Sequence, residues 1–462
     1  MDFSEKLEHA ENLFCDEKYD ESERKFEQLL NENTDEAGAC QIVECWVNCL
    51  MKRYYELQDV NNYEEAVIPC KKSLDLLNTY ADKFYDKLLC VRNDYALIIS
   101  ELEMYDEAEA EYISLISECR FYYGGKNHDM YIAMGNLAGI YSDTGRIPAA
   151  IAMRSHAING LRELHGKSHS DYIREMINLA FDYEYAGNYT KALALLEQAY
   201  ELRKQKLGMN NAYTIDVIFH IAVYYKRIQQ GEIAVRYFRL AASHIEKDDF
   251  ITLIHKVQYA ICLSWIGEKK QAERIVSKVS DQLSLAEYGV DELKENMEYA
   301  YSGIALYERN YAEAVLHAEN AVSCIINNNS VRKVNAREYV AEVLFYAGEY
   351  QRAYTILEQI SDHYEKTECD VLDLLMYNYV HANVTAALGI FDKAEKSVFN
   401  AMTISRQCSF ASASFLAFSA DAFLALKQGN DSEFERLRLL AMSYAAVGMD
   451  EREFEVVWLK NL

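Results

Sequence analysis

The chain has 462 residues, of which only 2 are Pro and 18 are Gly, too few for the closely spaced turns of a β-sandwich or barrel. Half of the residues are hydrophobic and 12% are aromatic, which excludes a disordered chain because disordered chains lack the apolar surface that offsets the entropy of ordering. The net charge of −26 predicts that the chain binds neither nucleic acid nor an anionic membrane.

The negative charge is concentrated at the two ends of the chain. Residues 1–120 hold 29 acidic and 12 basic side chains, a net charge of −17, and residues 261–462 carry a net charge of −11. Residues 121–260, by contrast, have a net charge of +2. This contrast either guides an acidic partner toward the middle of the chain or is a chance variation among solvated helix faces.

No targeting segment is recognisable at the N-terminus, which begins MDFSEKLEHA and lacks a basic region followed by an apolar stretch. The most apolar segment, 407–426, is interrupted by Asp421 and diluted by serines, so it does not predict a membrane span. The 11 cysteines are irregularly spaced and odd in number, which favours reduced thiols. The sequence therefore predicts a cytoplasmic protein.

Taken in chain order, the predicted helices come in pairs, and a small residue recurs in the second helix of each pair. These residues are Ser22, Ala66, Ala108, Ala150, Ala192, Ala234, Ala272, Ala314, Ala353, Ala394 and Ser432. In the middle of the chain a second small residue lies twelve positions earlier, at Ala138, Ala180 and Ala222. Because small side chains let two helices approach closely, each pair is predicted to form an antiparallel helix hairpin, and stacked hairpins would bury their apolar faces.

Two details concern the phase of this pattern, that is, which residue of each pair takes the position of the small residue. An aromatic residue lies three positions before the small residue in most pairs, as at Tyr189 and Tyr311. Pro69 falls inside the predicted second helix of the second pair, where it removes a backbone hydrogen bond. Either that helix is kinked or the phase slips at this point.

The pattern resembles the tetratricopeptide repeat family over nearly the whole chain. Residues 88–245 are similar to the kinesin light chain type of this repeat, because Gly125-Lys-Asn-His128 precedes Asn136-Leu-Ala and Gly166-Lys-Ser-His169 precedes Asn178-Leu-Ala. The resemblance implies an all-α, right-handed superhelical solenoid of about eleven antiparallel helix pairs. We expect degenerate acidic repeats in 1–87, regular 42-residue repeats in 88–245, degenerate repeats in 246–440 and a capping helix in 441–462.

No constellation of residues predicts catalysis, a metal site or a cofactor. The phosphate-binding loop, the serine nucleophile elbow and the H-E-x-x-H zinc motif are all missing from the sequence. Cys40, Cys45 and Cys49 cluster without a nearby His, and buried Cys is a common core residue. His165 and His169 flank a glycine in a predicted loop. We therefore predict a protein that is not an enzyme.

In the family that the chain resembles, the first helix of each pair lines a concave groove. Counting from the small residues of the middle repeats, the groove positions predict a peptide-binding set of Asn136, Arg174, Asn178, Tyr185, His220, Lys226, Arg227 and Trp265.

The chemistry of this set suits a peptide. The resemblance implies that the amides of Asn136 and Asn178 bond a peptide backbone, since an amide donates and accepts at once. Lys226 and Arg227 favour an acidic segment or a C-terminal carboxylate. The alternative is that these are exposed polar residues with no ligand.

Three functions are compatible with these residues. The first is a non-catalytic interaction scaffold that binds a peptide or protein segment in the groove. The second is a peptide-sensing receptor that controls a separate effector, and the third is an accessory subunit of an enzyme. A partner could instead grip the acidic N-terminal quarter through its own Lys and Arg side chains.

Overall fold

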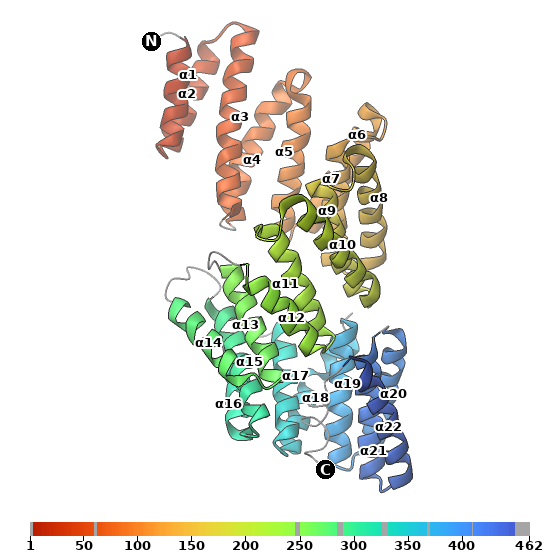
Figure 1. Ribbon diagram of the computed structural model, residues 1–462. Helices are drawn as coiled ribbons and strands as arrows, with labels where there is room; N and C mark the ends of the chain where they lie inside the picture. The colour runs from red at the N-terminus through yellow and green to blue at the C-terminus, as the bar shows by residue number, and fades with distance from the viewer. Residues whose placement is uncertain are drawn as a thin grey trace. The chain divides into compact units, whose positions relative to one another are not determined.

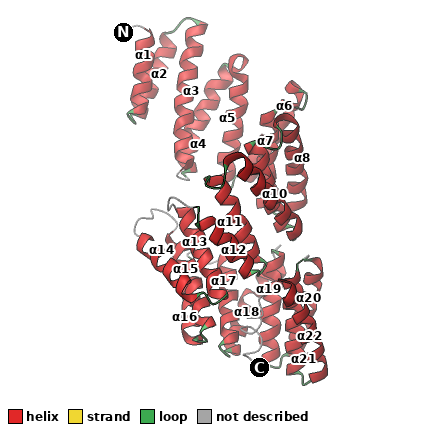
Figure 2. Ribbon diagram, viewed as in Figure 1, coloured by secondary structure: helices red, strands yellow, loops and turns green. Residues whose placement is uncertain are grey.

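The computed structural model describes residues 3–59, 62–244, 250–283, 290–325, 331–366, 370–408 and 410–448. These residues form 22 helices and no strand. Figure 2 shows the helices in red. The helices divide into two compact units, Met1–Glu175 and Met176–Leu462, and each unit is described by itself (Figure 1).

The helices alternate between the first and the second member of eleven pairs. The first helices are α1 (Phe3–Cys15), α3 (Glu36–Asp59), α5 (Ala81–Glu101), α7 (His128–Asp143), α9 (Ser170–Tyr185), α11 (Ala212–Arg227), α13 (Phe250–Trp265), α15 (Val290–Tyr307), α17 (Val331–Tyr346), α19 (Val371–Ala387) and α21 (Ala411–Lys427). The second helices are α2 (Tyr19–Glu32), α4 (Tyr63–Thr79), α6 (Tyr105–Tyr123), α8 (Ile147–His165), α10 (Tyr189–Leu207), α12 (Gly231–Ala242), α14 (Lys269–Gln282), α16 (Tyr311–Cys324), α18 (Tyr350–Lys366), α20 (Phe391–Gln407) and α22 (Asp431–Gly448).

The predicted small residues lie where the two helices of a pair meet. Ala138, Ala180 and Ala222 are at most 1% exposed, and so are the alanines twelve positions later. Where one member of the couple is serine, its hydroxyl bonds across the pair: Ser22 Oγ donates to Ala10 O at 2.7 Å, and Ser302 Oγ donates to Ala314 O at 2.9 Å. The predicted all-α solenoid of eleven antiparallel helix pairs is confirmed.

In the ten pairs whose turn the structure describes, the turn contains one residue with a positive φ. In nine of these pairs it lies five positions before the predicted small residue of the second helix. Six of these residues are glycines: Gly145, Gly187, Gly267, Gly348, Gly389 and Gly429. In four other turns the position is filled by Glu17, Glu103, Gln229 and Arg309, with φ between 58° and 62°. Side chains with a Cβ are strained in this conformation, so these four turns are held by the packing of the helices around them.

The last pair corrects one prediction. Ser432 is exposed, and the buried position is taken by Phe434, which follows Gly429 by five residues. The prediction was wrong because it was based on the small size of Ser432. The turn at Gly429 determines which residue of α22 is buried.

Pro69, in contrast, leaves the phase unchanged. It lies inside α4, and Ala66 in the same helix is fully buried as predicted. The phase predicted from the small residues therefore does not slip at this point.

The packing between pairs buries clusters of apolar side chains that span several helices in each unit. In unit 2, one cluster runs from Ile215 on α11 to Ile304 on α15 and includes Phe238 and Val257. In unit 1, Val43 on α3 and Val91 on α5 belong to one cluster. The predicted division of the repeats at 87, 245 and 440 stays a prediction, and residues 449–462 of the predicted capping helix lie outside the described residues.

Candidate functional site

A row of hydrogen-bonded polar side chains crosses three successive first helices of unit 2. Lys226 Nζ on α11 donates to Gln258 Oε1 on α13, and Gln258 Nε2 donates to Asn296 Oδ1 on α15 at 2.5 Å. Asn296 Nδ2 in turn donates to Glu292 O at 2.8 Å. We refer to Lys226, Gln258 and Asn296 as the polar row.

Lys226 leaves a positive charge in this row. Burial and the neighbouring Arg227 lower the pKa of Lys226, because both disfavour the charged ammonium. Within the described residues, no carboxylate forms an ion pair with Lys226. Its ammonium donates a hydrogen bond to the neutral amide of Gln258. A half-buried cation with an amide partner attracts an anionic ligand, since the anion would recover part of the solvation that the cation has lost.

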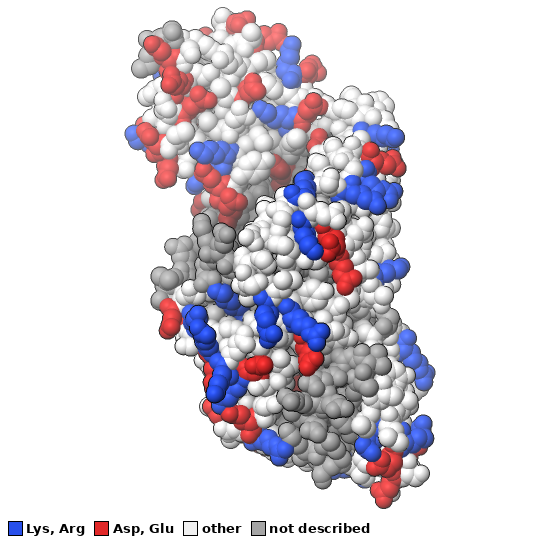
Figure 3. All heavy atoms as spheres, in the orientation of Figure 1, with Lys and Arg blue, Asp and Glu red and all other residues white. Residues whose placement is uncertain are grey.

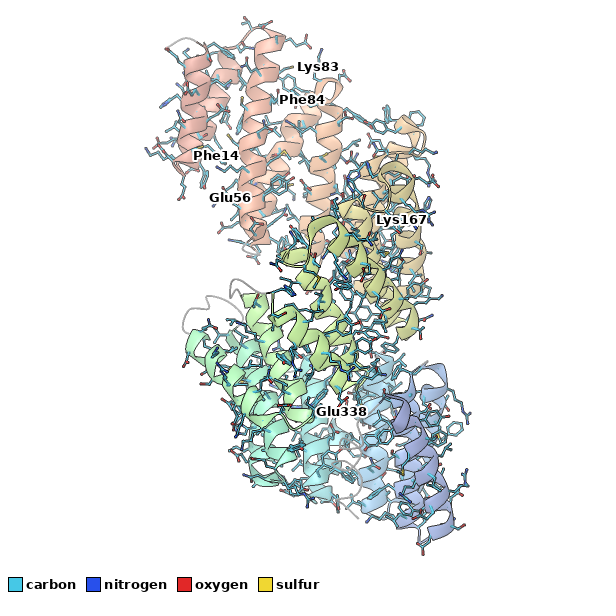
Figure 4. All side chains as sticks on the ribbon, in the orientation of Figure 1. Phe14, Glu56, Lys83, Phe84, Lys167 and Glu338 are labelled. Carbon is cyan, nitrogen blue, oxygen red and sulfur yellow. The ribbon has the colours of Figure 1, made fainter. Side chains whose placement is uncertain are left out.

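Carboxyl groups cluster on the next two first helices, α17 and α19. Glu338, labelled in Figure 4, accepts a hydrogen bond from Tyr364 OH at 2.7 Å, and Asp373 Oδ2 accepts one from Asn335 Nδ2 at 2.9 Å. Burial raises the pKa of Glu342 to about 7 and raises the pKa of Glu338 well above its usual range. The first helices of unit 2 therefore carry a cationic row followed by carboxyl groups that hold protons readily.

Arg227 is occupied by carboxylates of its own chain. It forms ion pairs with Glu184 at the end of α9 and, through Nη2 at 3.1 Å, with Asp370 Oδ2 before α19. These carboxylates raise the pKa of Arg227. A ligand would have to compete with them for the guanidinium.

The other predicted residues of unit 2 differ in accessibility. Tyr185 is 57% exposed, whereas Asn178 is half-buried. His220 Nε2 lies 3.4 Å from Asp216 Oδ1, and its ring meets that of Phe181 edge-on at 5.0 Å. Trp265 is half-buried and packs against the core of α11–α15. Of these four side chains, Tyr185 offers the most surface to a partner.

Two of the predicted residues belong to unit 1. Asn136 Nδ2 on α7 donates to Asn93 Oδ1 on α5 at 3.1 Å, which forms a short amide pair across neighbouring first helices. Arg174 is exposed, and its Nη1 lies 3.0 Å from Asp171 Oδ1. The amide of Asn136 is therefore the unit 1 counterpart of the polar row.

Unit 1 also has an open cavity of about 690 Å³ between α4, α5 and α6. Tyr85, Tyr95 and Tyr122 line it together with Arg92, whose guanidinium is bound by Glu111 and Glu118. Its lining follows α5 from Ala81 to Tyr95, the helix on which Figure 4 labels Lys83 and Phe84. Its lining adds Asp82 to the two glutamates, so carboxylates outnumber the single cation.

Among the residues that sequence reasoning missed are Asn296 of the polar row and Asp370, which pairs with Arg227. Asn296 lies six residues before Ser302, the small residue of α15. A position six residues before the small residue was already counted as a groove position in the middle repeats, so the same spacing could have found Asn296. Asp370 could not be found this way, because its contact with Arg227 joins residues that are far apart in the chain.

The structure gives the cysteine and histidine clusters no chemical role. Burial raises the pKa of Cys45 to about 11 and that of Cys49 to about 12, which keeps both thiols protonated. The rings of His165 and His169 stack with centroids 4.4 Å apart. Within the described ranges, no group of three or more His, Cys, Asp or Glu side chains is arranged to hold a metal ion.

A comparison with protein-family models finds repeats in the middle of the chain. The tetratricopeptide repeat model matches residues 129–205, and the eleven pairs continue the same phase on both sides of that match. The chain contains tetratricopeptide repeats. No curated protein matches this repeat protein, and the part of it that the structure describes has no helix with the length and apolar character needed to cross a membrane.

Two solved structures, RapI and NprR, share this fold at low sequence identity. RapI, in its apo form, is 13% identical with a TM-score of 0.53, over 78% of this chain and 98% of its own. The quorum sensor NprR from B. thuringiensis, also in its apo form, is 15% identical with a TM-score of 0.50, over the same shares. A putative kinesin light chain from Podosopora anserina is 15% identical over 52% of this chain and all of its own, with a TM-score of 0.29.

Proposed function

We propose that this repeat protein is a non-catalytic scaffold that binds an acidic, extended segment of a protein or peptide along the first helices of unit 2. The observation that supports this proposal is the polar row, where Lys226 presents a half-buried positive charge without a carboxylate partner in the described residues. Gln258 and Asn296 continue the row with amides that can donate to and accept from a peptide backbone.

The remaining predicted residues of unit 2 have supporting roles in this proposal. Tyr185 and His220 contribute exposed or half-buried aromatic surface in unit 2, and Asn178 contributes an amide. Trp265 supports the row from the core. Asn136 and Arg174 belong to unit 1 and are not part of this proposed site. We further propose a cytoplasmic location, since all ten cysteines among the described residues are free thiols.

A selection from a pool of random decapeptides on the immobilised full-length protein tests this function. We expect retained peptides to be enriched in Asp and Glu or to require a free C-terminal carboxylate. Lys226→Gln should weaken their binding at least tenfold, about 1.4 kcal/mol, with a larger loss at low salt because exposed charges are screened less there.

The matched control for this variant is Lys270→Gln, which removes an exposed lysine from α14 in the same unit. It should leave binding unchanged. If both variants bind like the unmodified protein, or if the retained peptides are basic, the polar row is not the site.

A peptide-sensing receptor that controls a separate effector is a narrower form of the same function. The likeness in fold to NprR, described as a quorum sensor, favours it over an accessory subunit of an enzyme. Capture from native cell extract separates the two. A short peptide recovered from the protein supports the receptor, whereas a large partner recovered without a peptide supports the scaffold alone.

The cavity of unit 1 supports a second binding function with the opposite charge preference. Its tyrosine rings and carboxylates suit a Lys or Arg side chain of a protein partner, through cation–π and ionic contacts. Asp and Glu side chains are spread over the face of unit 1 shown in Figure 3. Tyr122→Ala should abolish selection of basic decapeptides, while Tyr213→Ala, a similarly exposed tyrosine of unit 2, should not.

A further inference from the structure

Unit 2 contains contacts between parts of the chain that a simple stack of repeats would keep apart. In a solenoid each repeat touches its neighbours in sequence. Here Ser412 Oγ at the start of α21 donates to Ile228 O at 2.5 Å, across 184 residues. Gln229 Nε2 also lies 3.0 Å from Met376 Sδ on α19, across 147 residues.

A buried ion triad lies at the centre of these contacts. Arg227 is held between Glu184 and Asp370, whose side chains are 12% and 9% exposed. Asp370 also accepts from Tyr189 OH at 3.4 Å and caps α19 by accepting from Leu372 N at 2.8 Å. One carboxylate thus joins the α9–α11 region to the first turn of α19.

Apolar contacts complete the closure. The rings of Tyr189 and Phe410 meet edge-on with centroids 5.1 Å apart. A Cβ added at Gly187 would lie 3.1 Å from Val371 Cγ2, which shows how closely the α9–α10 turn approaches α19. We call this closure the clasp. One side of it consists of residues 184–189 and 227–229, and the other side consists of residues 370–376 and 410–412.

The clasp adjoins the polar row, because Arg227 of the clasp and Lys226 of the row are consecutive residues of α11. In the closed clasp, both ion-pair partners of Arg227 are carboxylates of the chain itself. An acidic ligand at Lys226 can reach the second cation only after one of these carboxylates withdraws. Such a ligand has a higher affinity for the open clasp than for the closed one, and this difference is what shifts the population.

We propose that the clasp is an autoinhibitory contact, in which Asp370 and Glu184 occupy Arg227 and an acidic ligand on the polar row opens the closure by displacing them. This inference rests on the proposed function of unit 2. It assigns Arg227 two roles in sequence: it holds the closed state first and binds the ligand afterwards.

Asp370→Asn tests the competition with little change in shape, because asparagine remains a good helix N-cap. The probe is the acidic decapeptide pool selected on the full-length protein. We expect this variant to bind the pool about fivefold more tightly, since a larger fraction of molecules is competent to bind. Asp216→Asn on α11 is the control for the loss of a negative charge and should have a smaller effect.

A disulfide lock tests gating without altering charge. The Cβ positions of residues 187 and 371 would be 3.5 Å apart, within the range that a disulfide requires. Full-length protein with Gly187→Cys and Val371→Cys should form this bridge under mild oxidation, detected as a linked peptide by mass spectrometry. The bridged protein should bind the pool at least about fivefold more weakly than the reduced protein, with Val371→Cys alone as control.

The outcomes separate the two proposals. If the bridge does not form, the clasp is not closed in solution and the inference is wrong. If the bridged and reduced proteins bind equally, or if Asp370→Asn weakens binding, the clasp does not gate the row although the row remains the site. If no form of the protein retains acidic peptides, the proposed function fails, and the gating fails with it.

Discussion

Units 1 and 2 are built from the same helix pairs, yet they differ in how far their contacts reach along the chain. In unit 1 the longest separation spanned by a described hydrogen bond is 49 residues, between Lys72 and Glu23. In unit 2 the clasp spans up to 184 residues. The repeat pattern alone therefore does not decide whether a run of pairs stays open or closes.

The difference has consequences for stability and function. Where repeats touch only their neighbours, stability is close to a sum of local terms, and damage spreads from one repeat to the next. A closing contact links the first and the last repeats of a run, so that a change in one of them is transmitted to the other. The predictions below use this contrast, beginning with the largest expected effect.

Arg154→Met should destabilise unit 1 most. Arg154 Nη1 lies 2.7 Å from Glu175 Oε2, and the two side chains are 5% and 1% exposed. Removing the arginine leaves the buried carboxylate with only the more exposed Arg174, whose Nε lies 3.4 Å from Glu175 Oε1. Breaking a buried ion pair in this way costs up to about 3–5 kcal/mol. Urea unfolding of the full-length protein should show one transition for each unit, and the loss of stability should appear in the transition of unit 1.

The double variant Arg154→Met/Glu175→Met provides the control, because replacing both charges with apolar groups avoids the unpaired charge. It should recover most of the lost stability. Equal losses in the single and the double variant would mean that packing, and not the ion pair, holds this contact.

Two glycines test whether damage stays local. A Cβ at Gly160 would overlap the ring of Tyr131 in unit 1, and a Cβ at Gly303 would overlap Ser264 Oγ in unit 2. Each change to alanine should cost about 1–3 kcal/mol through overpacking. In the Gly160→Ala variant, hydrogen exchange should increase only in the repeats beside residue 160. In the Gly303→Ala variant, it should increase beside residue 303 and also at the clasp.

Gly139→Ala is the matched control, since nothing lies within 4 Å of the added Cβ on α7. This change should stabilise the helix by about 0.5–1 kcal/mol. If exchange after Gly303→Ala rises only in the repeats beside it, unit 2 behaves as an open stack like unit 1.

The stability of unit 2 should depend on Glu342 between about pH 5 and 8. Burial raises the pKa of this carboxyl in the folded protein to about 7, above its value in the unfolded chain. The folded state therefore holds the proton more tightly, and stability falls as the pH rises through about 7. A rise in pKa from 4.5 to about 7 makes this fall about 3 kcal/mol, at about 1.4 kcal/mol for each pKa unit.

Glu342→Gln should flatten this dependence, because the amide resembles the protonated carboxyl and does not titrate. Thermal unfolding at pH 5, 6, 7 and 8 measures the slope, with the unit 1 transition as internal reference. An equally steep loss of stability in the variant would assign the titration to its neighbours, such as Glu338 and Asp373, whose pKa values burial also raises.

The smallest predicted effects lie in the turns. Glu103→Gly in unit 1 and Arg309→Gly in unit 2 relieve a positive φ of about 60°, and each should raise the free energy of unfolding by up to about 1 kcal/mol. Gly348→Ala, at φ 77°, should lower it by about the same amount. If the glycine variants are less stable than the original protein, side-chain contacts of Glu103 and Arg309 outweigh the strain.

The sequence by itself determined the helix pairs, their number and most of their phase. Small residues spaced by twelve and turn residues five positions earlier are local signals, because they depend on contacts between adjacent helices. For that reason Ala66 and Ala394 were placed correctly. Ser432 was misplaced because the choice rested on side-chain size alone, whereas Gly429 sets the turn.

The candidate site was only partly predictable. The spacing rule found Lys226 and, applied one repeat further, would have found Asn296, because both lie at counted positions of first helices. It could not reveal that Arg227 is held by Glu184 and Asp370. That contact depends on the small rotation between successive pairs, which accumulates over several repeats until α11 and α19 meet, and such a sum is a property of the tertiary structure and not of any single repeat.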